Sequence, residues 1–522
     1  MHEFKYVGMK KTRFLWVDDE IDLLKPYILF LEEKGYVVES VNNGHDAIDR
    51  CRQTHFDMIF LDEHMPGISG LETLTRINDF LPDTPVVMVT KSEDEGIMDK
   101  AIGKKIADYL IKPVNPNQIL MTVKKHLDKN EIIREANTVN YRDEFGLLST
   151  EINSCASPAD WVSLYKKLAH WDVELSESQH PMKELLEMQY AEANNAFGKS
   201  LKQHYLSWLQ ATDNQMIMSH LVFSDIVFPL LDRGDKVFFI LIDNFRFDQW
   251  LVIKDRVAQQ FTYAEDAYFS ILPTATHYAR NALFAGLLPE EIAESYPQFW
   301  VEEGEEESKN QFEEELLAAQ LKCSGRKEPF SYRKINNTQE AERLLNSFSV
   351  LEQKSLNVLV YNFIDMLSHA RTDSTMIREL APTEAAYRSL TRSWFLHSPL
   401  LGLLQKIAEK GYRAVITTDH GTIRVKNALK IVSDKSTNTN LRYKLGKNME
   451  YDAKKVFEIT QPAQYGLPSP NLSSRYVFAT SNDFFVYPTN HNQYVSYYEN
   501  TFQHGGISME EMIVPLITLQ AK

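Results

Sequence analysis

The sequence lacks the features that mark secreted and membrane proteins. Its 522 residues include three cysteines (Cys51, Cys155 and Cys323), too far apart in the sequence to form a metal-binding pair. No apolar run approaches the roughly 18 residues that a membrane span needs. The first residues, MHEFKYVGMKK, contain no apolar signal core. These absences predict a cytoplasmic protein with reduced thiols and no membrane span.

The chain also lacks a surplus of basic residues. Its formal net charge is −16, whereas proteins that bind duplex DNA carry a basic footprint. No helix-turn-helix pattern with a basic recognition helix is visible. Binding of duplex DNA is therefore not expected to be the main task, and a transcription regulator is kept only as an alternative.

The length is sufficient for two or three domains, each with its own core. In the first part, short apolar runs alternate with amphipathic segments, which predicts an α/β domain with a doubly wound, five-stranded parallel sheet. The expected strands are Arg13–Val17, Val37–Ser40, Asp57–Leu61, Val86–Val89 and Asp108–Ile111.

The strand pattern then stops and later returns. Residues 128–219 predict a helical bundle, in which Ser157, Pro158 and Asp160 give a typical helix start, and His180-Pro181 opens a longer helix. At Lys236 the run VFFILID is typical of a strand buried on both faces. Further runs follow at Val358–Phe363, Ala414–Thr417, Tyr476–Phe478 and Met512–Leu519. We therefore expect three domains, at 1–127, 128–219 and 220–522, the last an α/β domain with a central sheet.

Two stretches of the third domain have the composition of insertions. Residues 302–315 hold eight glutamates, which predicts a solvated surface. Residues 425–491 are polar and contain a basic cluster of Arg442, Lys444 and Lys447.

Polar side chains follow several strands of the first domain. Asp18 and Asp19 end the first strand in WVDDE, and Asp62 ends the third in LDEHMPG. Such strand ends converge on one crevice. Because three adjacent carboxylates repel one another, we expect a hard cation such as Mg²⁺ between them. Thr90 and Lys112, at the ends of the fourth and fifth strands, can bind phosphoryl oxygens.

This combination resembles the receiver domain of two-component response regulators over about 115 residues. The resemblance implies that Asp62 accepts a phosphoryl group from a histidine kinase. It implies that Asp18, Asp19 and Asp62 hold Mg²⁺ together with the backbone carbonyl of His64. It also implies that Thr90 and Tyr109 change orientation on phosphorylation.

The third domain carries a second set of polar residues, most of which follow strands. The set comprises Asp243, Asp365 and His369 in IDMLSH, Asp419 and His420 in TTDHG, and His504 in QHGGIS. A helical turn places Asp365 and His369 on one face. Mixed Asp and His ligation with open positions is typical of catalytic zinc. Two zinc ions about 4 Å apart can activate a hydroxyl and hold both the attacking and the leaving oxygen.

A hydroxyl nucleophile is available in SILPTATHYARNALFAG. We expect Pro273-Thr274 to end a strand and Thr276 to begin the next helix, where the helix N-terminus favours an anionic phosphoryl group. Thr274 and Thr276 both remain candidates. Arg280, one turn further, is a candidate for a phosphate oxygen, and so are Arg442 and Lys444 in the second insertion.

The order Asp, Thr, Asp-x-x-x-His, Asp-His and a late His resembles the alkaline-phosphatase superfamily, and the closing HGGISMEEMIVPLI resembles its PglZ branch. The resemblance implies that one zinc is bound by Asp243, Thr276, Asp419 and His420. The other is then bound by Asp365, His369 and His504. In that superfamily a glycine closes the helix about ten residues after the nucleophile; Gly286 therefore favours Thr276.

The succession of receiver, helical middle and PglZ-type domain resembles fusion regulators of type IX secretion and gliding in Bacteroidetes. This resemblance implies a PorY-like sensor histidine kinase as partner, possible contacts with a secretion-motor protein and a sigma factor, and a homodimer on phosphorylation. The substrate it favours is a phosphodiester in short linear or cyclic oligonucleotides. The alternative is a metal-binding signalling scaffold without catalysis.

Overall fold

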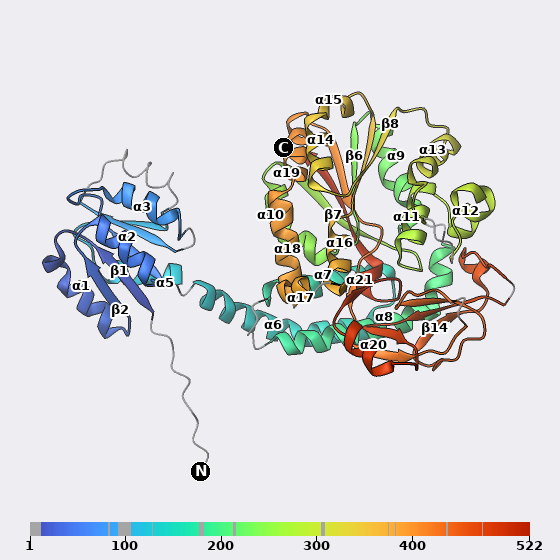
Figure 1. The fold of residues 1–522 in the computed structure, drawn as a ribbon, viewed down its shortest axis with the longest axis horizontal. Coiled ribbons are helices and arrows are strands. Elements are labelled where there is room, and N and C mark those ends of the chain that lie inside the picture. Colours follow the sequence, from blue (N-terminus) through green and yellow to red (C-terminus); the bar gives the residue numbers. More distant parts are fainter. Residues whose placement is uncertain are drawn as a thin grey trace, which may run out of the picture. The chain divides into compact units, whose positions relative to one another are not determined.

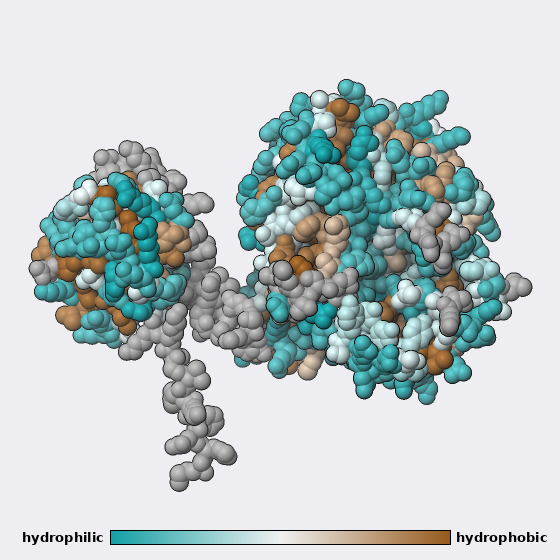
Figure 2. All heavy atoms as spheres, in the orientation of Figure 1, coloured by the Kyte–Doolittle hydropathy of each residue, from teal (hydrophilic) through white to brown (hydrophobic). Residues whose placement is uncertain are grey.

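The computed structural model describes residues 12–81, 84–91, 106–127, 129–176, 182–211, 216–303, 308–373, 375–381, 383–434, 437–471 and 473–522. The chain divides into two compact units, Met1–Asn137 and Thr138–Lys522, which are described separately. None of the described helices is long and apolar enough to cross a membrane. Hydrophilic residues cover most of the face of each unit that Figure 2 shows.

The first unit contains a five-stranded parallel sheet in the order β2-β1-β3-β4-β5. Its strands are β1 (Arg13–Val17), β2 (Val37–Val41), β3 (Met58–Leu61), β4 (Val86–Thr90) and β5 (Asp108–Ile111). The described helices are α1 (Ile21–Glu33), α2 (Gly44–Gln53), α3 (Gly70–Asn78) and α5 (Pro116–Leu127). Separate apolar clusters, one containing Leu15 and Ile59 and the other Trp16 and Phe60, form the core. The predicted doubly wound sheet is confirmed.

Three long helices form the helical middle of the chain: α6 (Lys129–Ser154), α7 (Pro158–Glu174) and α8 (Lys183–Leu209). Ser157 and Asp160 form a capping box at the start of α7, which satisfies two backbone donors reciprocally. His180 and Pro181, the expected start of the next helix, lie outside the described residues. Buried residues of α7 and α8, such as Trp161 and Phe197, belong to one continuous core with the central sheet of the second unit.

The second unit is organised around a six-stranded mixed sheet in the order β7-β18-β10-β6-β9-β8. Strands β10, β6, β9 and β8 are parallel, and β18 is antiparallel to both β10 and β7. The strands are β6 (Val237–Ile242), β7 (Phe261–Phe269), β8 (Phe330–Ile335), β9 (Leu356–Tyr361), β10 (Arg413–Thr417) and β18 (Ile513–Ala521). The expected α/β domain with a central sheet is confirmed.

Helices cover both faces of this sheet (Figure 1). One group includes α10 (Phe247–Ala258), α18 (Glu384–His397) and α19 (Pro399–Glu409). The other includes α9 (Phe228–Asp232), α11 (Thr276–Ala285) and α13 (Glu313–Cys323). Gly286 ends α11 with φ +66°, and a Cβ at this position would lie 2.3 Å from the Gln320 side chain. Only glycine fits this helix end without strain.

One expected strand lies outside the central sheet, and one expected strand end is wrong. Tyr476–Phe478 does not extend the central sheet; it lies in β15 (Arg475–Ala479), which pairs with β13 (Tyr443–Gly446) and β14 (Val456–Ile459) in a separate sheet. Strand β7 ends at Phe269, so Pro273 and Thr274 lie in the following turn. Another pair, β12 (Asn427–Lys430) with β16 (Asp483–Val486), completes a folded insertion that has its own apolar cluster.

Candidate functional site

In the first unit, three carboxylates meet beyond the ends of β1 and β3. Asp18, Asp19 and Asp62 each offer a ligand oxygen, and these oxygens lie within 4.8 Å of one another. Asp18 and Asp62 are buried and Asp19 is exposed. Lys112 Nζ lies 2.5 Å from Asp18 Oδ2 and 2.9 Å from Asp62 Oδ2. Burial raises the pKa of Asp62, and Lys112 opposes this shift. This group of oxygen ligands fits a hard cation such as Mg²⁺.

The two expected switch residues lie in β4 and β5. Thr90 is fully buried, and its Oγ1 is 3.3 Å from His64 Nδ1. Tyr109 is half-buried and packs against the apolar cluster that contains Leu15 and Ile59. Residues 92–105, between these strands, lie outside the described part of the chain.

In the second unit, the candidate ligands form two groups at one end of the central sheet. Asp243 follows β6, and Asp419 and His420 follow β10; ligand atoms of these three residues lie within 4.8 Å of one another. Asp365, His369 and His504 form the second group by the same measure. Parallel strands thus bring together residues that are far apart in the sequence.

The two groups adjoin each other. The rings of His420 and His504 stack with centroids 4.2 Å apart, and the rings of His504 and His369 are 6.3 Å apart. Asp365 and His369 lie on α16 (Phe363–Asp373), where Asp365 Oδ2 is 3.5 Å from His369 Nε2. All six sequence-predicted Asp and His ligands therefore lie around one small region.

The electrostatics of this region are those of carboxylates crowded in a buried site. Burial raises the pKa of Asp243 well above its ordinary value, with Asp419 and Asp365 adding to the shift and Arg280 opposing it. For Asp419 the desolvation by burial is outweighed by Arg280 and His420, which lower its pKa to about 2. Burial, followed by His420 and His369, lowers the pKa of His504, which favours its neutral form.

One buried oxygen bears directly on metal binding. Among the described residues, Asp243 Oδ1 is buried without a hydrogen-bond partner, and such an atom is costly unless a cation or donor satisfies it. Two Asp/His groups of this composition fit zinc, which takes mixed nitrogen and oxygen ligands.

The two candidate threonines have different surroundings. Thr276 is the first residue of α11, and its Oγ1 lies 3.1 Å from His420 Nε2. Thr274 is fully buried, donates to the Gly506 carbonyl at 2.8 Å and accepts from the Gly505 amide at 3.1 Å. The Thr274 hydroxyl therefore holds the loop that carries His504, whereas the Thr276 hydroxyl faces the candidate ligands.

The basic residues expected to bind phosphate are engaged elsewhere. Arg280 is fully buried and pairs with Asp243, Asp419 and Glu313, so it stabilises ligand carboxylates instead of facing an open pocket. Lys444 is buried and donates to the Asn438 carbonyl, and burial lowers its pKa to about 8.

Arg442 is also fully buried. It pairs with Glu511, whose Oε1 in turn accepts from the Gly506 amide at 2.9 Å. Through Glu511, Arg442 thus helps to hold the loop that contains His504 and Gly506 in place. Both charges are thus satisfied by protein partners, and a phosphate site at Arg442 and Lys444 stays a prediction.

The glutamate-rich insertion is only in part the expected solvated surface: Glu302, Glu314 and Glu315 are exposed. Glu313 is 1 % exposed and pairs with Arg280 and Lys334. Glu303 accepts hydrogen bonds from the hydroxyls of Tyr278 and Tyr443. Glu303 and Glu313 therefore contact residues next to the candidate ligands and do not form a solvated surface. Residues 304–307 lie outside the described part of the chain.

A cavity of about 520 Å³ opens beside Thr276 and the second ligand group. Besides those residues and Asp243, it is lined by six polar side chains that the sequence did not identify: His277, Lys309, Asn310, Asn336, Asn362 and Asn440. Asn336 and Asn362 directly follow β8 and β9, so the strand-end rule that located the ligands would also have found these two. No sequence motif identifies the other four.

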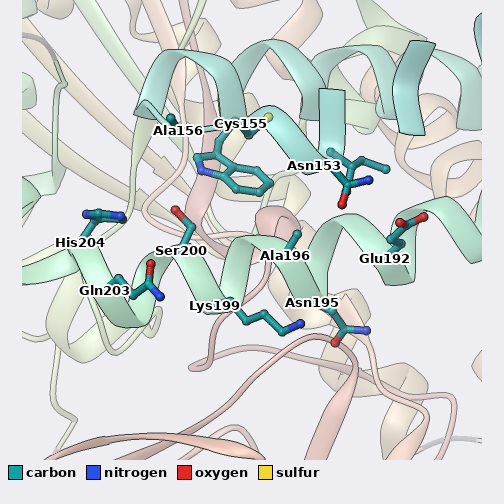
Figure 3. A pocket seen from close by; sticks show the side chains of 12 residues that line it. Asn153, Cys155, Ala156, Glu192, Asn195, Ala196, Lys199, Ser200, Gln203 and His204 are labelled. Atoms are coloured by element: carbon teal, nitrogen blue, oxygen red, sulfur yellow. The ribbon is translucent and has the colours of Figure 1, made fainter. Parts of the chain in front are cut away.

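A second hollow, of about 750 Å³, lies in the helical middle (Figure 3). Glu192, Asn195, Lys199 and Gln203 line it from α8, and Asn153, Cys155 and Ala156 line it from the opposite side. It contains none of the candidate ligands.

Comparisons with protein families cover nearly the whole chain. The model described as "BREX system PglZ alkaline phosphatase-like domain" matches residues 222–519. The model described as "Response regulator receiver domain" matches residues 14–124. The model described as "PorX response regulator linker domain" matches residues 131–209. The expected succession of receiver, linker and PglZ domains in one chain is confirmed.

Curated relatives match over about a quarter of the chain. The transcriptional regulatory protein CrdR of Helicobacter pylori is 34% identical over 125 residues, covering 24% of this chain and 58% of that protein. The transcriptional regulatory protein ResD of Bacillus subtilis is 29% identical over 131 residues, covering 25% of this chain and 52% of that protein. The chain thus spans a little over half the length of these relatives.

Among solved structures, the response regulator TrrA of Thermotoga maritima in complex with Mg²⁺ and beryllofluoride is 29% identical, covering 22% of this chain and 99% of that chain, with a TM-score of 0.21. A CheY-like receiver domain protein of Methanospirillum hungatei is 27% identical, covering 23% of this chain and 96% of that chain, with a TM-score of 0.23.

The PglZ model accounts for more than half of the residues, and the receiver and linker models account for most of the remainder. The chain belongs to the PglZ family of alkaline phosphatase-like proteins, in the form of a PorX-like fusion with a response-regulator receiver domain.

Proposed function

We propose that this protein is a response regulator whose output is a zinc-dependent phosphodiesterase with Thr276 as its nucleophile. One observation carries the proposal: two adjacent groups of three Asp and His ligands adjoin the hydroxyl of Thr276 at the start of α11. A scaffold without catalysis has no need of a hydroxyl at this position.

The chemistry assigned to the chain's own residues is a double displacement. The Thr276 oxygen attacks phosphorus and expels the alcohol of one ester arm, which takes up the proton of the threonine hydroxyl; the intermediate is a threonine phosphodiester that retains the other arm. Water then cleaves the bond between the threonine oxygen and phosphorus, which restores the hydroxyl and releases a phosphomonoester. The N-terminus of α11 favours the negative charge of the phosphoryl group. Asp243, Thr276, Asp419 and His420 would hold one zinc, and Asp365, His369 and His504 the other. When bound, the zinc ions supply Lewis acidity and neutralise charge at the reacting oxygens.

The substrate class we propose is the phosphodiester of short linear or cyclic oligonucleotides. The cavity beside Thr276 is large enough for more than a phosphate group, and most of the residues that line it are of polar types. A monoester has no second arm to occupy that space, so the binding energy available there favours diesters.

The test combines metal analysis with a hydrolysis screen. Purified protein should retain about two zinc ions per chain after dialysis, and it should cleave dinucleotides better than phosphomonoesters. His369→Ala should lose one ion and most of the activity. A folded protein that retains no transition metal, or that prefers monoesters strongly, would contradict the proposal.

For the first unit, we propose that Asp62 is the phosphoryl acceptor and that Asp18, Asp19 and Asp62 bind Mg²⁺. A receiver domain implies a sensor histidine kinase as phosphodonor, here one of the PorY type. Phosphorylation would favour a homodimer, and the pathway served would be type IX secretion and gliding, with a secretion-motor protein and a sigma factor as further partners. Phosphotransfer from such a kinase, absent in Asp62→Ala, is the direct check.

A further inference from the structure

The polar residues that line the cavity beside Thr276 include two chemically distinct sets. One comprises the candidate metal ligands Asp243, Asp365, His369 and His504. The other, here called the amide wall, consists of Lys309, Asn310, Asn336, Asn362 and Asn440. The amide wall is assembled from the glutamate-rich insertion, the ends of β8 and β9, and the second insertion.

Lys309 is a cation held in place at the cavity. Its Nζ lies 2.8 Å from Glu303 Oε2, and its side chain is 30% exposed. Its backbone carbonyl accepts a hydrogen bond from Asn281 Nδ2 at 3.0 Å. Burial opposes ionisation of Glu303, but the neighbouring His277, whose Nδ1 is 3.7 Å from Glu303 Oε1, and hydrogen bonds from Lys309 and Tyr443 outweigh it and lower the pKa of Glu303 to about 2. Glu303 therefore remains a fixed anion that orients the ammonium group.

The asparagines of the amide wall are likewise positioned by the fold and retain unused hydrogen-bonding groups. Asn362 donates to Asn336 Oδ1 at 2.7 Å, while Asn362 Oδ1 is buried without a partner among the described residues. Asn440 Oδ1 accepts from the backbone amides of Arg442 and Tyr443, which leaves its Nδ2 to donate. A lining that offers both donors and acceptors matches hydroxyls and base edges better than it matches an apolar group.

We propose that the amide wall binds the second ester arm of the substrate, and that Lys309 determines specificity by pairing with a further phosphate on that arm. This inference rests on the proposed phosphodiesterase function. The preferred substrate is then a diester whose arms are nucleosides and which carries at least one additional phosphate. A diester with aryl arms leaves these polar groups unpaired, and that loss reduces its transition-state binding.

The test compares two diesters with the full-length protein. The 5′-phosphorylated dinucleotide pApA carries the additional phosphate, and bis-p-nitrophenyl phosphate has two aryl arms. Lys309→Gln should lower kcat/KM for pApA about 10- to 100-fold, as expected for a lost charge-assisted hydrogen bond. It should lower kcat/KM for the aryl diester far less. Lys309→Arg should restore most of the preference, and Lys322→Gln, an exposed lysine on α13, should leave both rates unchanged.

Binding gives a readout that does not depend on turnover. In a Thr276→Ala background, calorimetric titration with pApA should show a Kd about 10-fold higher when Lys309→Gln is added, with zinc content unchanged. An equal loss on both diesters, or an unchanged Kd, would overturn the inference. If neither diester is hydrolysed but Lys309→Gln still weakens pApA binding, the phosphodiesterase proposal fails and the binding site stands.

Discussion

At the residue scale, Thr276 is the position where a small change should have the largest chemical effect. Thr276→Ala removes the hydroxyl 3.1 Å from His420 Nε2 while leaving all six Asp and His ligands in place. We expect kcat to fall by about 10³-fold or more, because a water molecule replaces a positioned nucleophile. Hydrolysis rates and elemental analysis check this together. Activity near that of the wild type would exclude Thr276 as the nucleophile.

Thr274 should show the opposite profile, a change in stability. Thr274→Ala leaves the Gly506 carbonyl and the Gly505 amide without their buried partner, at a cost of about 1–3 kcal/mol in the free energy of unfolding. Denaturant unfolding measures this difference. Thr274→Ser keeps the hydroxyl and is the matched control; equal destabilisation by both variants would assign the effect to the methyl group.

Glu510 makes stability depend on pH. Burial raises its pKa from 4.5 to about 7, although Asn194 donates to its carboxylate. Between these two values the folded protein retains a proton that the unfolded chain has lost. The free energy of unfolding therefore falls as the pH rises through this window, and the loss is complete above pH 7.

The variant Glu510→Gln should remove this loss, since an amide has no proton to release. Relative to the wild type, it should gain about 1–3 kcal/mol between pH 5 and pH 8. Urea titrations at several pH values give the comparison. A constant difference between the two proteins over this range would show that Glu510 titrates normally.

At the scale of elements, the helices α7 and α8 are structural parts of the PglZ unit. Arg388 of α18 pairs with Asp172 of α7. Asn194 of α8 accepts from the Met509 backbone amide at 2.8 Å, in α21 (Met509–Met512). Together with the shared apolar core, these contacts make the helical middle more than a spacer.

A pair of shortened chains tests this conclusion. A chain of residues 138–522 should unfold in one cooperative transition, whereas a chain of residues 220–522 exposes the apolar surface that α7 and α8 cover and should bind a hydrophobic dye or aggregate. Circular dichroism and dye fluorescence distinguish the two. Cooperative unfolding of the shorter chain would show that the helices are dispensable for the fold.

The sequence predicted the elements that carry a strong local signal. Buried parallel strands such as β6 read as continuous apolar runs, and the ligands were found because they follow such strands. Strand β7 was missed because most of its side chains are at least partly exposed, so it shows no apolar run. The burial of Arg442 depends on Glu511, a partner 69 positions away, and no local pattern contains that information. Lys309 was missed because its place at the cavity depends on lining residues that are far from it in the sequence, such as Asn440 and His504.

At the scale of the whole molecule, we propose that phosphorylation of Asp62 changes the rate of hydrolysis at Thr276. Beryllofluoride at Asp62 adds negative charge and acceptor oxygens beside Lys112 and Thr90. An activator must favour one state of the protein over another. We therefore expect both the mass in solution and the hydrolysis rate to change when beryllofluoride and Mg²⁺ are added.

Light scattering and rate measurements on the wild type and on Asp62→Ala are the test. If neither quantity changes in the wild type, the receiver and the hydrolase are tethered without coupling. If Asp62→Ala responds equally, the signal does not enter at this aspartate.

The position of β18 within the central sheet has a consequence for how the protein is made. This strand, Ile513–Ala521, lies between β7 and β10, so the sheet has a gap until the ribosome has synthesised residue 521. The receiver sheet needs no residue beyond β5 and can form early. At about 5–20 residues per second, the receiver domain can be folded for some 20–80 s before β18 is synthesised and the central sheet of the PglZ domain can be completed. A nascent chain can therefore carry a folded receiver domain while its PglZ domain still lacks a strand of the central sheet and exposes surface that chaperones bind.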